Sequence, residues 1–347
     1  MENLKKLTIY EYQPKSMLVN SETKVDRAKY PAIDGHNHLR CIVDADSVFL
    51  DEYVEKMDSC NVQAIVDLDG GWGDTLDKHL EVLKKPRPDR FIIFASINFS
   101  KITEPDFGEK AAEELEVCIK KGAQGLKIFK SLGLGVKDEK GNYIPVDSPL
   151  LDPVWSKCGE LKIPVVIHVS DPAAFFTPLD KYNERLEELI DRPEWMFNKP
   201  EYFSKEDLLL QRNRVISKHP GTNFIGAHVA NLPEDLNKVS AWLDMYPNLY
   251  VDLSARLSEL GRQPYSARRF IIKYADRIIF GTDGNAMGQS IEEMYRTHWR
   301  FLESDDEYFD ISKSHKLQGR WNVYGLFLPD DVLEKIYRNN ILKLISL

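Results

Sequence analysis

Five residues of this 347-residue chain are candidate metal ligands, because each is a histidine or an aspartate that lies in or directly after an apolar run. His36 and His38 form a His-x-His pair in AIDGHNH. His168 follows IPVVI, His228 follows NFIGA, and Asp283 follows RIIFGT. Imidazole nitrogens and a carboxylate oxygen suit Zn²⁺, Fe²⁺, Mn²⁺ or Ni²⁺. A metal site therefore requires a fold that brings these five side chains to one place.

Short runs of strand composition alternate with longer helical segments along nearly the whole chain. Eight strand runs are expected, at residues 32–36, 62–67, 91–98, 123–129, 164–168, 223–228, 248–253 and 277–282. Between them, apolar residues recur at the i, i+3, i+4 spacing of a helix, in segments such as 46–58, 108–121, 149–161 and 233–246. Eight βα units predict an α/β fold, a (β/α)8 TIM barrel.

A barrel would bring the five candidate ligands together. The carboxyl ends of its strands meet on one face, where enzymes of this fold carry their catalytic groups. Because side chains alternate along a strand, Asp34, His36 and His38 are expected to share one face. The alternative for His168 and His228 is a core role, with each imidazole satisfied by backbone groups. The convergence of all five ligands on one face favours the metal site.

The chain divides into a short extension and one large domain. Residues 1–30 are expected to form an N-terminal extension, and residues 31–347 a single barrel domain. Residues 171–217 separate the fifth and sixth strands by more than an ordinary connection, so an insertion is expected there. It would fold over the active-site face, with its aromatic side chains in a small core of their own. Residues 329–347 are expected to form a C-terminal helix whose apolar stripe packs under or beside the barrel.

Composition excludes several classes of protein. With 46 basic and 55 acidic residues, the net charge of −9 gives no attraction to nucleic-acid phosphates. No apolar stretch reaches the roughly 18 residues of a membrane span. The cysteines are far apart, which predicts free thiols, and the N-terminus has no apolar signal segment. We therefore expect a cytoplasmic protein, with a processed secreted form as the alternative. Its expected partner is a small-molecule substrate, with no nucleic acid and no membrane, and whether it forms a homo-oligomer stays open.

The order of the candidate ligands resembles a known family. His-x-His on the first strand, histidines on the fifth and sixth, and aspartate on the eighth are similar to the amidohydrolase superfamily. The phrases GLKIFK, VVIHVSDP, IGAHVAN, FGTD and LPDDVLEKIYRNN resemble its amidohydrolase-related branch, which includes enzymes like aminocarboxymuconate semialdehyde decarboxylase. The resemblance covers about residues 31–347.

The resemblance implies a divalent metal bound by His36, His38, His168 and Asp283. Zinc is the first choice, with manganese, iron or nickel as alternatives. His228 would then stand beside the metal-bound water as a proton donor or orienting group. Asp283 could accept the proton of that water.

The segment GLKIFK contains two lysines, Lys127 and Lys130, for which different roles are expected. In binuclear members of the superfamily, a carboxylated lysine on the fourth strand bridges two metals, and Lys127 is the matching residue. Its alternatives are a substrate-binding ammonium or a structural ion pair. Lys130 falls on the opposite face or in the following loop, so a solvated charge is expected.

Two arginines could bind an anionic substrate group. Arg40 follows the His-x-His pair and Arg256 follows the seventh strand, and a guanidinium fork matches a carboxylate. The alternative is that each arginine pairs with a nearby aspartate. Further polar residues at strand ends are expected either to contact substrate or to make supporting hydrogen bonds: Asp67, Asp69, Asn98 and Asp252.

Together these features predict a metal-dependent hydrolase. Metal-activated water would attack a carbonyl-type centre, in an amide, lactone or ester, of a small and carboxylate-bearing substrate. A non-oxidative decarboxylase with the same metal site is the alternative, since both occur in the branch. A catalytically silent binding barrel is disfavoured because all five ligand positions are filled.

Overall fold

The computed structural model describes residues 2–8, 11–12, 14–45, 47–285, 290–312, 318–319 and 321–347. Residue 46, the expected start of the helix at 46–58, lies outside them, as do residues 1, 9, 10 and 13 of the expected extension.

Two parallel sheets form the centre, with strand orders β10-β1-β2-β3 and β4-β5-β6-β7-β8-β9. Their strands are β1 (Ala32–His38), β2 (Val62–Asp67), β3 (Phe91–Ile93), β4 (Ala95–Ser96), β5 (Leu126–Ile128), β6 (Val165–Ile167), β7 (Phe224–Gly226), β8 (Leu249–Asp252), β9 (Ile278–Ile279) and β10 (Gly284–Asn285).

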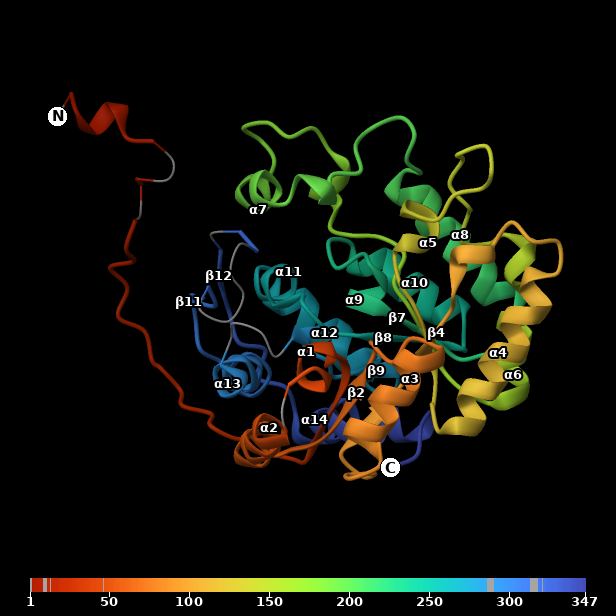
Figure 1. Cartoon of the computed structure of the whole chain (residues 1–347). Helices are drawn as coiled ribbons and strands as arrows, with labels where there is room; N and C mark the ends of the chain where they lie inside the picture. The colour runs from red at the N-terminus through yellow and green to blue at the C-terminus, as the bar shows by residue number, and fades with distance from the viewer. Residues whose placement is uncertain are drawn as a thin grey trace.

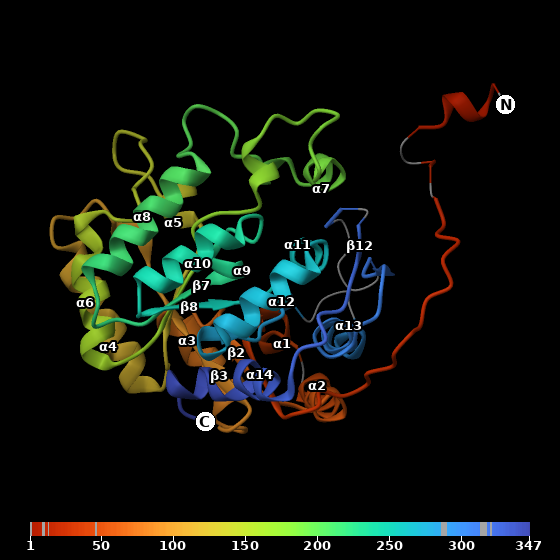
Figure 2. The ribbon, with the colours of Figure 1, turned by 180° about the vertical axis from the view of Figure 1, so that it is seen from behind.

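Helices surround the strands on the outside (Figures 1 and 2). They are α1 (Arg40–Val43), α2 (Ser47–Ser59), α3 (Gly73–His79), α4 (Phe107–Lys121), α5 (Ser131–Leu134), α6 (Asp152–Leu161), α7 (Leu186–Asp191), α8 (Lys205–Lys218), α9 (Ala227–Ala230), α10 (Leu236–Met245), α11 (Leu257–Gly261), α12 (Pro264–Lys273), α13 (Ile291–Glu303) and α14 (Asp330–Glu334). A small antiparallel pair, β11 (Phe309–Asp310) and β12 (Asn322–Val323), follows α13.

The two sheets adjoin at two places, or seams. At the first seam, the edge strands β3 and β4 belong to one continuous segment of chain. β3 and β4 are consecutive, separated only by Phe94. The Phe94 amide donates to the carbonyl of Asp67 in β2 (2.9 Å), and the Ala95 amide donates to the carbonyl of Gly125 just before β5 (2.9 Å). This segment therefore serves as one barrel strand, as expected for residues 91–98.

The second seam joins the end of the last expected strand to the first. The Gly35 amide donates to the Phe280 carbonyl (2.9 Å), and the Asp283 amide donates to the His36 carbonyl (2.8 Å). The eight expected strand runs thus form one ring, and the predicted TIM barrel is confirmed. Asp283 is brought beside β1 by the same hydrogen bonds that join the seam.

The interior of the ring is apolar, and the helices bury its outer face in a second, larger cluster. Burial on both faces explains why runs such as PVVI are continuously apolar rather than alternating. The interior side chains are Ile33, Ala64, Val66, Leu68, Ile92, Phe94, Val166, Ile225, Ala227 and Ile279, and they pack against Ile341, Leu344 and Ile345 from the C-terminal segment.

The C-terminal segment closes the amino end of the barrel. The expected helix is present, and its hydrogen-bond pattern changes along its length, from α14 through Lys335–Asn339 to Ile341–Lys343, while the backbone at Lys335 and Asn340 stays right-handed helical. The Asn340 side chain donates to two backbone carbonyls before and in β9, at 2.6 and 2.8 Å. The predicted apolar stripe is buried, with Leu333 and Ile341 at 1% and 0% exposure.

The prediction that Asp34 shares a face with His36 and His38 is wrong. β1 pairs with β2 with a register shift between Asp34 and Asn37, so strict alternation fails there. The buried Asp34 carboxylate accepts a hydrogen bond from the Tyr295 hydroxyl (2.9 Å). Because Tyr295 belongs to α13 on the outside of the ring, Asp34 anchors this helix and does not line the barrel mouth (Figure 1).

The segment between β6 and β7 carries α7 and α8. Its aromatic rings contact one another, as expected, with Phe175 stacked on Trp195 (6.0 Å between ring centroids) and Phe197 beside Phe176 (5.5 Å). At the other end of the chain, residues 2–8 lie away from the barrel (Figure 1), whereas Thr23 donates to Asp306 and the Ala28 amide donates to the Cys60 carbonyl.

All four cysteines are free thiols, as predicted. Within the part of the chain that the structure describes, no helix is long and apolar enough to cross a membrane.

Replacement of the buried Ile341 by alanine tests the role of the C-terminal segment. Ile341→Ala should lower the free energy of unfolding by about 2–5 kcal/mol, because it leaves a cavity in the barrel interior. Ile190→Ala is the matched control, since Ile190 is 47% exposed and should cost less than about 1 kcal/mol. Urea unfolding of both variants measures the difference, and equal costs would contradict the assignment.

Candidate functional site

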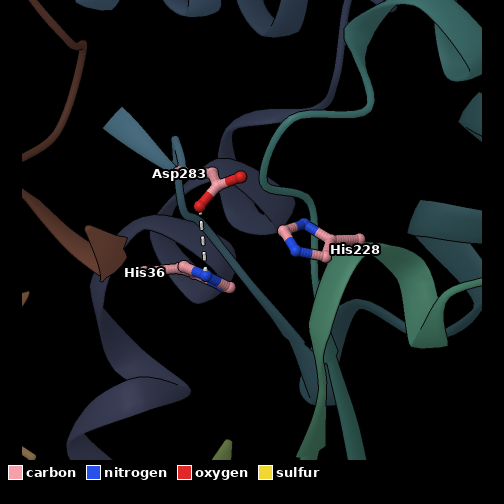
Figure 3. A group of neighbouring side chains, drawn as sticks. All are labelled: His36, His228 and Asp283. Atoms are coloured by element: carbon pink, nitrogen blue, oxygen red, sulfur yellow. Dashed lines mark ion pairs between the residues drawn. The ribbon is translucent and has the colours of Figure 1, made fainter. Parts of the chain in front are cut away.

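Histidines from two strand ends converge on one aspartate at the carboxyl end of the barrel. Asp283 Oδ1 lies 3.4 Å from His36 Nε2 and 3.2 Å from His38 Nε2. One ligand atom from each of His36, His228 and Asp283 lies within 4.8 Å of the others (Figure 3). The structure thus brings together four of the five predicted candidate ligands.

These separations suit a shared metal ion. Two ligand atoms at about 2.0–2.1 Å from one ion and at tetrahedral angles are about 3.3 Å apart. The distances from Asp283 Oδ1 to His36 and His38 are close to this value. They are longer than the 2.7–2.9 Å typical of a charge-assisted hydrogen bond. The donor set therefore fits a divalent cation.

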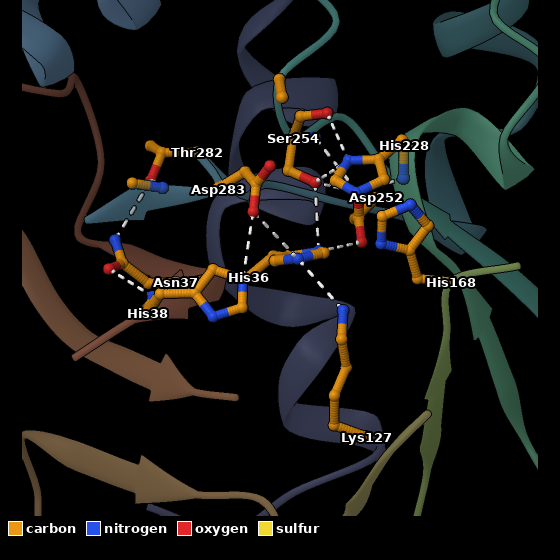
Figure 4. Close-up of polar contacts among 12 residues, drawn as sticks. His36, Asn37, His38, Lys127, His168, His228, Asp252, Ser254, Thr282 and Asp283 are labelled. Carbon is orange, nitrogen blue, oxygen red and sulfur yellow. Dashed lines mark hydrogen bonds and ion pairs between the residues drawn. The ribbon is translucent and has the colours of Figure 1, made fainter. Parts of the chain in front are cut away.

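Hydrogen bonds place a proton on Nδ1 of three histidines, and Figure 4 shows those of His36 and His228. His36 Nδ1 donates to Asp252 Oδ2 (2.8 Å), and His38 Nδ1 donates to Asp69 Oδ1 (2.8 Å). His228 Nδ1 donates to the Ser254 carbonyl (3.0 Å). Because carboxylates and carbonyls can only accept here, each Nδ1 carries a proton, and a neutral imidazole then keeps its lone pair on Nε2. In His38, burial opposes the charge, but hydrogen bonds to Asp283 and Asp69 raise the pKa to about 9, so Nε2 carries a second proton toward Asp283 until a cation replaces it.

His168 is oriented in the opposite sense. Its Nε2 donates to the Ser170 carbonyl (3.1 Å), which leaves the lone pair on Nδ1. Its ring centroid lies 4.5 Å from that of His228. Burial lowers its pKa to about 4, so the imidazole is neutral at physiological pH. His168 lies beside the three residues whose ligand atoms are within 4.8 Å of one another, but does not belong to that group.

A partly buried ion pair adjoins His168 and corrects one expectation. Lys130 is not a solvated charge: its Nζ lies 2.5 Å from Asp171 Oδ2 and above the ring of Trp195, 5.3 Å from the centroid. Asp171 Oδ1 in turn lies 3.5 Å from His168 Nε2. Burial opposes ionisation of Asp171, but Lys130 and His168 together hold its pKa below the usual range. Sequence reasoning did not identify Asp171, although it stands three residues after a candidate ligand.

Lys127 reaches the centre of the site. It is fully buried, and its Nζ lies 3.3 Å from His36 Nε2. Burial lowers its pKa to about 8. No carboxylate of a described residue lies within 4 Å of this ammonium, so the ion-pair alternative is wrong. Its position opposite His36 is compatible with both remaining interpretations, a second-metal ligand and a substrate-binding group.

The backbone that carries His228 is left-handed. β7 ends at Gly226, and His228 (φ 57°, ψ 52°) begins a turn that continues through Val229 (φ 57°) and Asn231 (φ 57°). For non-glycine residues this conformation costs roughly 1–2 kcal/mol each. The expectation that His228 ends a strand is therefore wrong by two residues. Strained backbone of this kind concentrates at functional sites, and Asp283 (φ 59°) shares it.

The pKa values of His228 and Asp283 are both lowered, which leaves the histidine neutral and the aspartate charged. Burial, and then the charge of Arg256, lower the pKa of His228 well below its usual value. Burial opposes the charge of Asp283, but His228 and the two histidines of β1 hold its pKa well below the usual range. At neutral pH the site therefore contains a neutral His228 and an ionised Asp283.

The two candidate arginines lie in different surroundings. Arg40 is exposed and lines a cavity of about 500 Å³ together with Asp69, Trp72 and Phe129. Arg256 is buried, and it donates from Nη1 to the Ala255 carbonyl (2.6 Å). Its Nε has no hydrogen-bond partner among the described residues. Neither guanidinium has a described carboxylate within 4 Å, so the aspartate-pairing alternative is wrong.

The remaining strand-end residues support the fold or the histidines. Asp69 and Asp252 orient His38 and His36, as described above. The carboxylate of Asp67 accepts from His79 Nδ1 (2.5 Å), and the Asn98 side chain caps a short helical turn. Ser254 was missed, although it comes two residues after Asp252 and its hydroxyl donates to that carboxylate (2.5 Å).

The amidohydrolase family model matches residues 75–347. The chain belongs to the amidohydrolase family. It is therefore an amidohydrolase-type enzyme, as the sequence motifs predict. The matched residues include Lys127, His168, His228 and Asp283, whereas the His-x-His pair precedes them. None of the curated proteins compared with the chain matches it.

Solved amidohydrolase-like structures share the fold at low identity. The 2,6-dihydroxybenzoate decarboxylase from Rhizobium is 18% identical, with a TM-score of 0.53, covering 91% of this chain and 98% of its own. The 5-carboxyvanillate decarboxylase from Sphingomonas paucimobilis is 12% identical, with a TM-score of 0.52, covering 92% and 100%. The 4-oxalomesaconate hydratase from Rhodopseudomonas palustris is 14% identical, with a TM-score of 0.54, covering 90% and 95%.

Proposed function

We propose that this amidohydrolase is a metal-dependent hydrolase of a small, carboxylate-bearing amide, lactone or ester. The observation that carries the proposal is the set of four histidines, each oriented by a hydrogen bond from one ring nitrogen so that the other can bind a cation. Three of these nitrogens are Nε2 of His36, His38 and His228, beside or near the ionised carboxylate of Asp283. Such a set supports the binding of a cation in front of the barrel mouth.

The proposed ligands are His36, His38, His168 and Asp283, with zinc as the first choice and manganese, iron or nickel as alternatives. A divalent ion held there would polarise a substrate oxygen and lower the pKa of water toward neutrality. The carboxylates of Asp69 and Asp252 support this role by orienting their histidines, an arrangement common around metal-binding histidines.

Asp283 and His228 are the proposed proton-transfer groups. The ionised Asp283 carboxylate can accept a proton from the attacking water. His228 presents a neutral Nε2, because its Nδ1 proton is held by the Ser254 carbonyl. In that state it can orient a substrate or accept a proton, and it becomes a donor to the leaving group only after it has been protonated.

Arg256 is the stronger candidate for binding the substrate carboxylate, with Arg40 as the second. The charge of Arg256 acts to lower the pKa of the buried Glu259 and of Glu188, but neither carboxylate lies within 4 Å of the guanidinium. A buried guanidinium nitrogen is favourable only when an acceptor satisfies it. Arg256 is buried, close enough to His228 to lower its pKa, and has an unpartnered Nε. These observations support an anionic group of the substrate as its partner.

We also propose that residues 171–217 cover the barrel mouth. Two contacts support this: Arg185 from this segment donates to Ser258 Oγ after β8 (3.2 Å), and Lys205 donates to the Asn231 carbonyl after β7 (2.7 Å). The four free thiols support a reducing compartment, the cytoplasm.

A non-oxidative decarboxylase is the second candidate. It is favoured by two kinds of decarboxylase among the similar structures, named for 2,6-dihydroxybenzoate and for 5-carboxyvanillate. A screen of lactones, acyl-amino compounds and aromatic carboxylates separates the two candidates. Release of CO₂ from a carboxylate substrate would favour the decarboxylase, and a new acid without CO₂ would favour the hydrolase.

Metal content tests the ligand assignment. Protein purified without chelator should contain roughly one equivalent of divalent metal per chain. His36→Ala and Asp283→Ala should lose it, because each removes a donor from the set. His219→Gln is the control, since His219 pairs with Asp152 away from the other histidines. Elemental analysis decides, and full metal in both ligand variants would refute the assignment.

Replacement of His228 separates catalysis from metal binding. His228→Asn should retain the metal and lose roughly 10²-fold or more in kcat, the usual scale for a positioned acid or base. Metal content and turnover are measured on the same preparation, with a substrate from the screen. Because a ligand atom of His228 lies within 4.8 Å of His36 and Asp283, loss of metal in this variant would instead identify His228 as a ligand.

Arginine replacements test the anionic substrate group. Arg256→Met should lower kcat/KM for a carboxylate substrate by about 10- to 150-fold, the worth of a charge-assisted hydrogen bond, and should change little with the neutral amide analogue. Arg40→Met is compared on the same pair. Arg262→Met is the control, because Arg262 pairs with the partly exposed Glu184. If no variant distinguishes the two compounds, the substrate has no anion bound here.

A further inference from the structure

Arg212 of α8 is a buried cation without a counterion. It is fully buried, and no carboxylate of a described residue lies within 4 Å of its guanidinium. Its partners are the Asn213 side-chain oxygen, which accepts from Nε (3.2 Å) and Nη2 (2.8 Å), the Ala230 carbonyl, which accepts from Nη1, and the ring of Trp242 (4.7 Å from Cζ to the centroid). Burial of an unpaired charge is costly. We therefore ask which part of the structure the hydrogen bonds of Arg212 stabilise.

The Ala230 carbonyl belongs to the left-handed turn at residues 228–231. All four of these residues have positive φ, and none is glycine. The turn begins at His228, whose amide donates to Asp252 Oδ1 (2.8 Å). At its other end, the Asn231 side-chain oxygen accepts from the Val169 amide (3.2 Å). Arg212 donates to the Ala230 carbonyl, which lies in the turn between these two hydrogen-bonded residues.

The conformation of the turn determines where the His228 imidazole lies. In a right-handed turn, the Cα–Cβ bond of His228 would point in a different direction from the same β7 end. The hydrogen bond from Nδ1 to the Ser254 carbonyl would then be lost, and with it the tautomer that keeps the Nε2 lone pair. Contacts that hold the turn left-handed therefore also hold the catalytic geometry.

We propose that Arg212 is a positioning residue for His228: it keeps the turn 228–231 left-handed by donating to the Ala230 carbonyl. A planar guanidinium can hold Asn213 through two nitrogens while a third reaches Ala230, which a lysine ammonium on one flexible stem cannot do with the same geometry. The orientation of His228 does not depend on the reaction; only the kinetic readout below rests on the proposed function.

The test compares Arg212→Met with Arg214→Met in the full-length protein as purified. Arg214 is on the same helix, with an exposed side chain paired to Asp147, so it is the matched control. Histidine Cε1–H NMR resonances are recorded, and the His228 signal is assigned by its absence in His228→Asn. Arg212→Met should shift the His228 signal and leave that of His219 in place, whereas Arg214→Met should shift neither.

A rescue separates positioning from a general loss of structure. Glycine adopts positive φ without the cost that alanine bears. Ala230→Gly in the Arg212→Met background should therefore return the His228 signal toward its wild-type position, and Arg212→Lys should do so less completely. If Arg212→Met does not fold, Asn213→Ala, which removes the acceptor that aligns the guanidinium, should shift the same signal. A folded Arg212→Met or Asn213→Ala protein with an unshifted His228 signal would overturn the proposal.

A kinetic comparison completes the test once a substrate is known. Arg212→Met should lower kcat by roughly 10- to 100-fold, as expected for a misplaced catalytic group, without loss of metal. In the His228→Asn background the same change should have little further effect, since Arg212 acts through His228. Equal losses in both backgrounds would overturn the proposal. If the screen finds no substrate, the NMR shift still decides the positioning role independently of the proposed function.

Discussion

The carboxylate of Asp252 is the contact on which the rest of the site depends. One oxygen accepts from His36 Nδ1 at 2.8 Å, and the other accepts from the His228 backbone amide at 2.8 Å and from the Ser254 hydroxyl at 2.5 Å. A single buried anion thus sets the tautomer of one histidine and the backbone position of another. Because burial opposes the charge while the histidines lower the pKa of Asp252 below its usual range, the anion and the imidazoles stabilise one another.

Closure of the barrel brings the Asp252 carboxylate within hydrogen-bond distance of His36. Asp252 is the last residue of β8 and pairs in register with Ile279 of β9, two residues before Gly281. The Cβ of any larger residue at Gly281 would lie 2.9 Å from the His36 Cβ, so glycine is required for β1 to approach this segment. The contact between Asp252 and His36 therefore needs the ring to be closed, although the two residues are 216 positions apart in the chain.

The sequence predicted the barrel and the candidate ligands because both depend on regular features. Continuous apolar runs mark strands buried on both faces, and each of the runs ending near His168, His228 and Asp283 does form a strand or lies beside one. The face of Asp34 was predicted wrongly because one register shift reverses the alternation beyond it. The environment of Lys130 was predicted wrongly because its partner, Asp171, lies 41 positions away and no local pattern connects the two. Tertiary contacts of this kind determine which charges are buried.

The left-handed turn shows why the orientation of the site could not be predicted from local preference. Glycine or asparagine usually marks positive φ, but His228, Val229 and Ala230 give no such signal and only Asn231 does. Each of the first three costs roughly 1–2 kcal/mol in this conformation. Hydrogen bonds to charged groups contribute about 1.5–3 kcal/mol each, and the turn has three, with Asp252, Arg212 and Lys205. The contacts and the strain are thus of similar size, so the turn persists only while its charged partners remain buried around it.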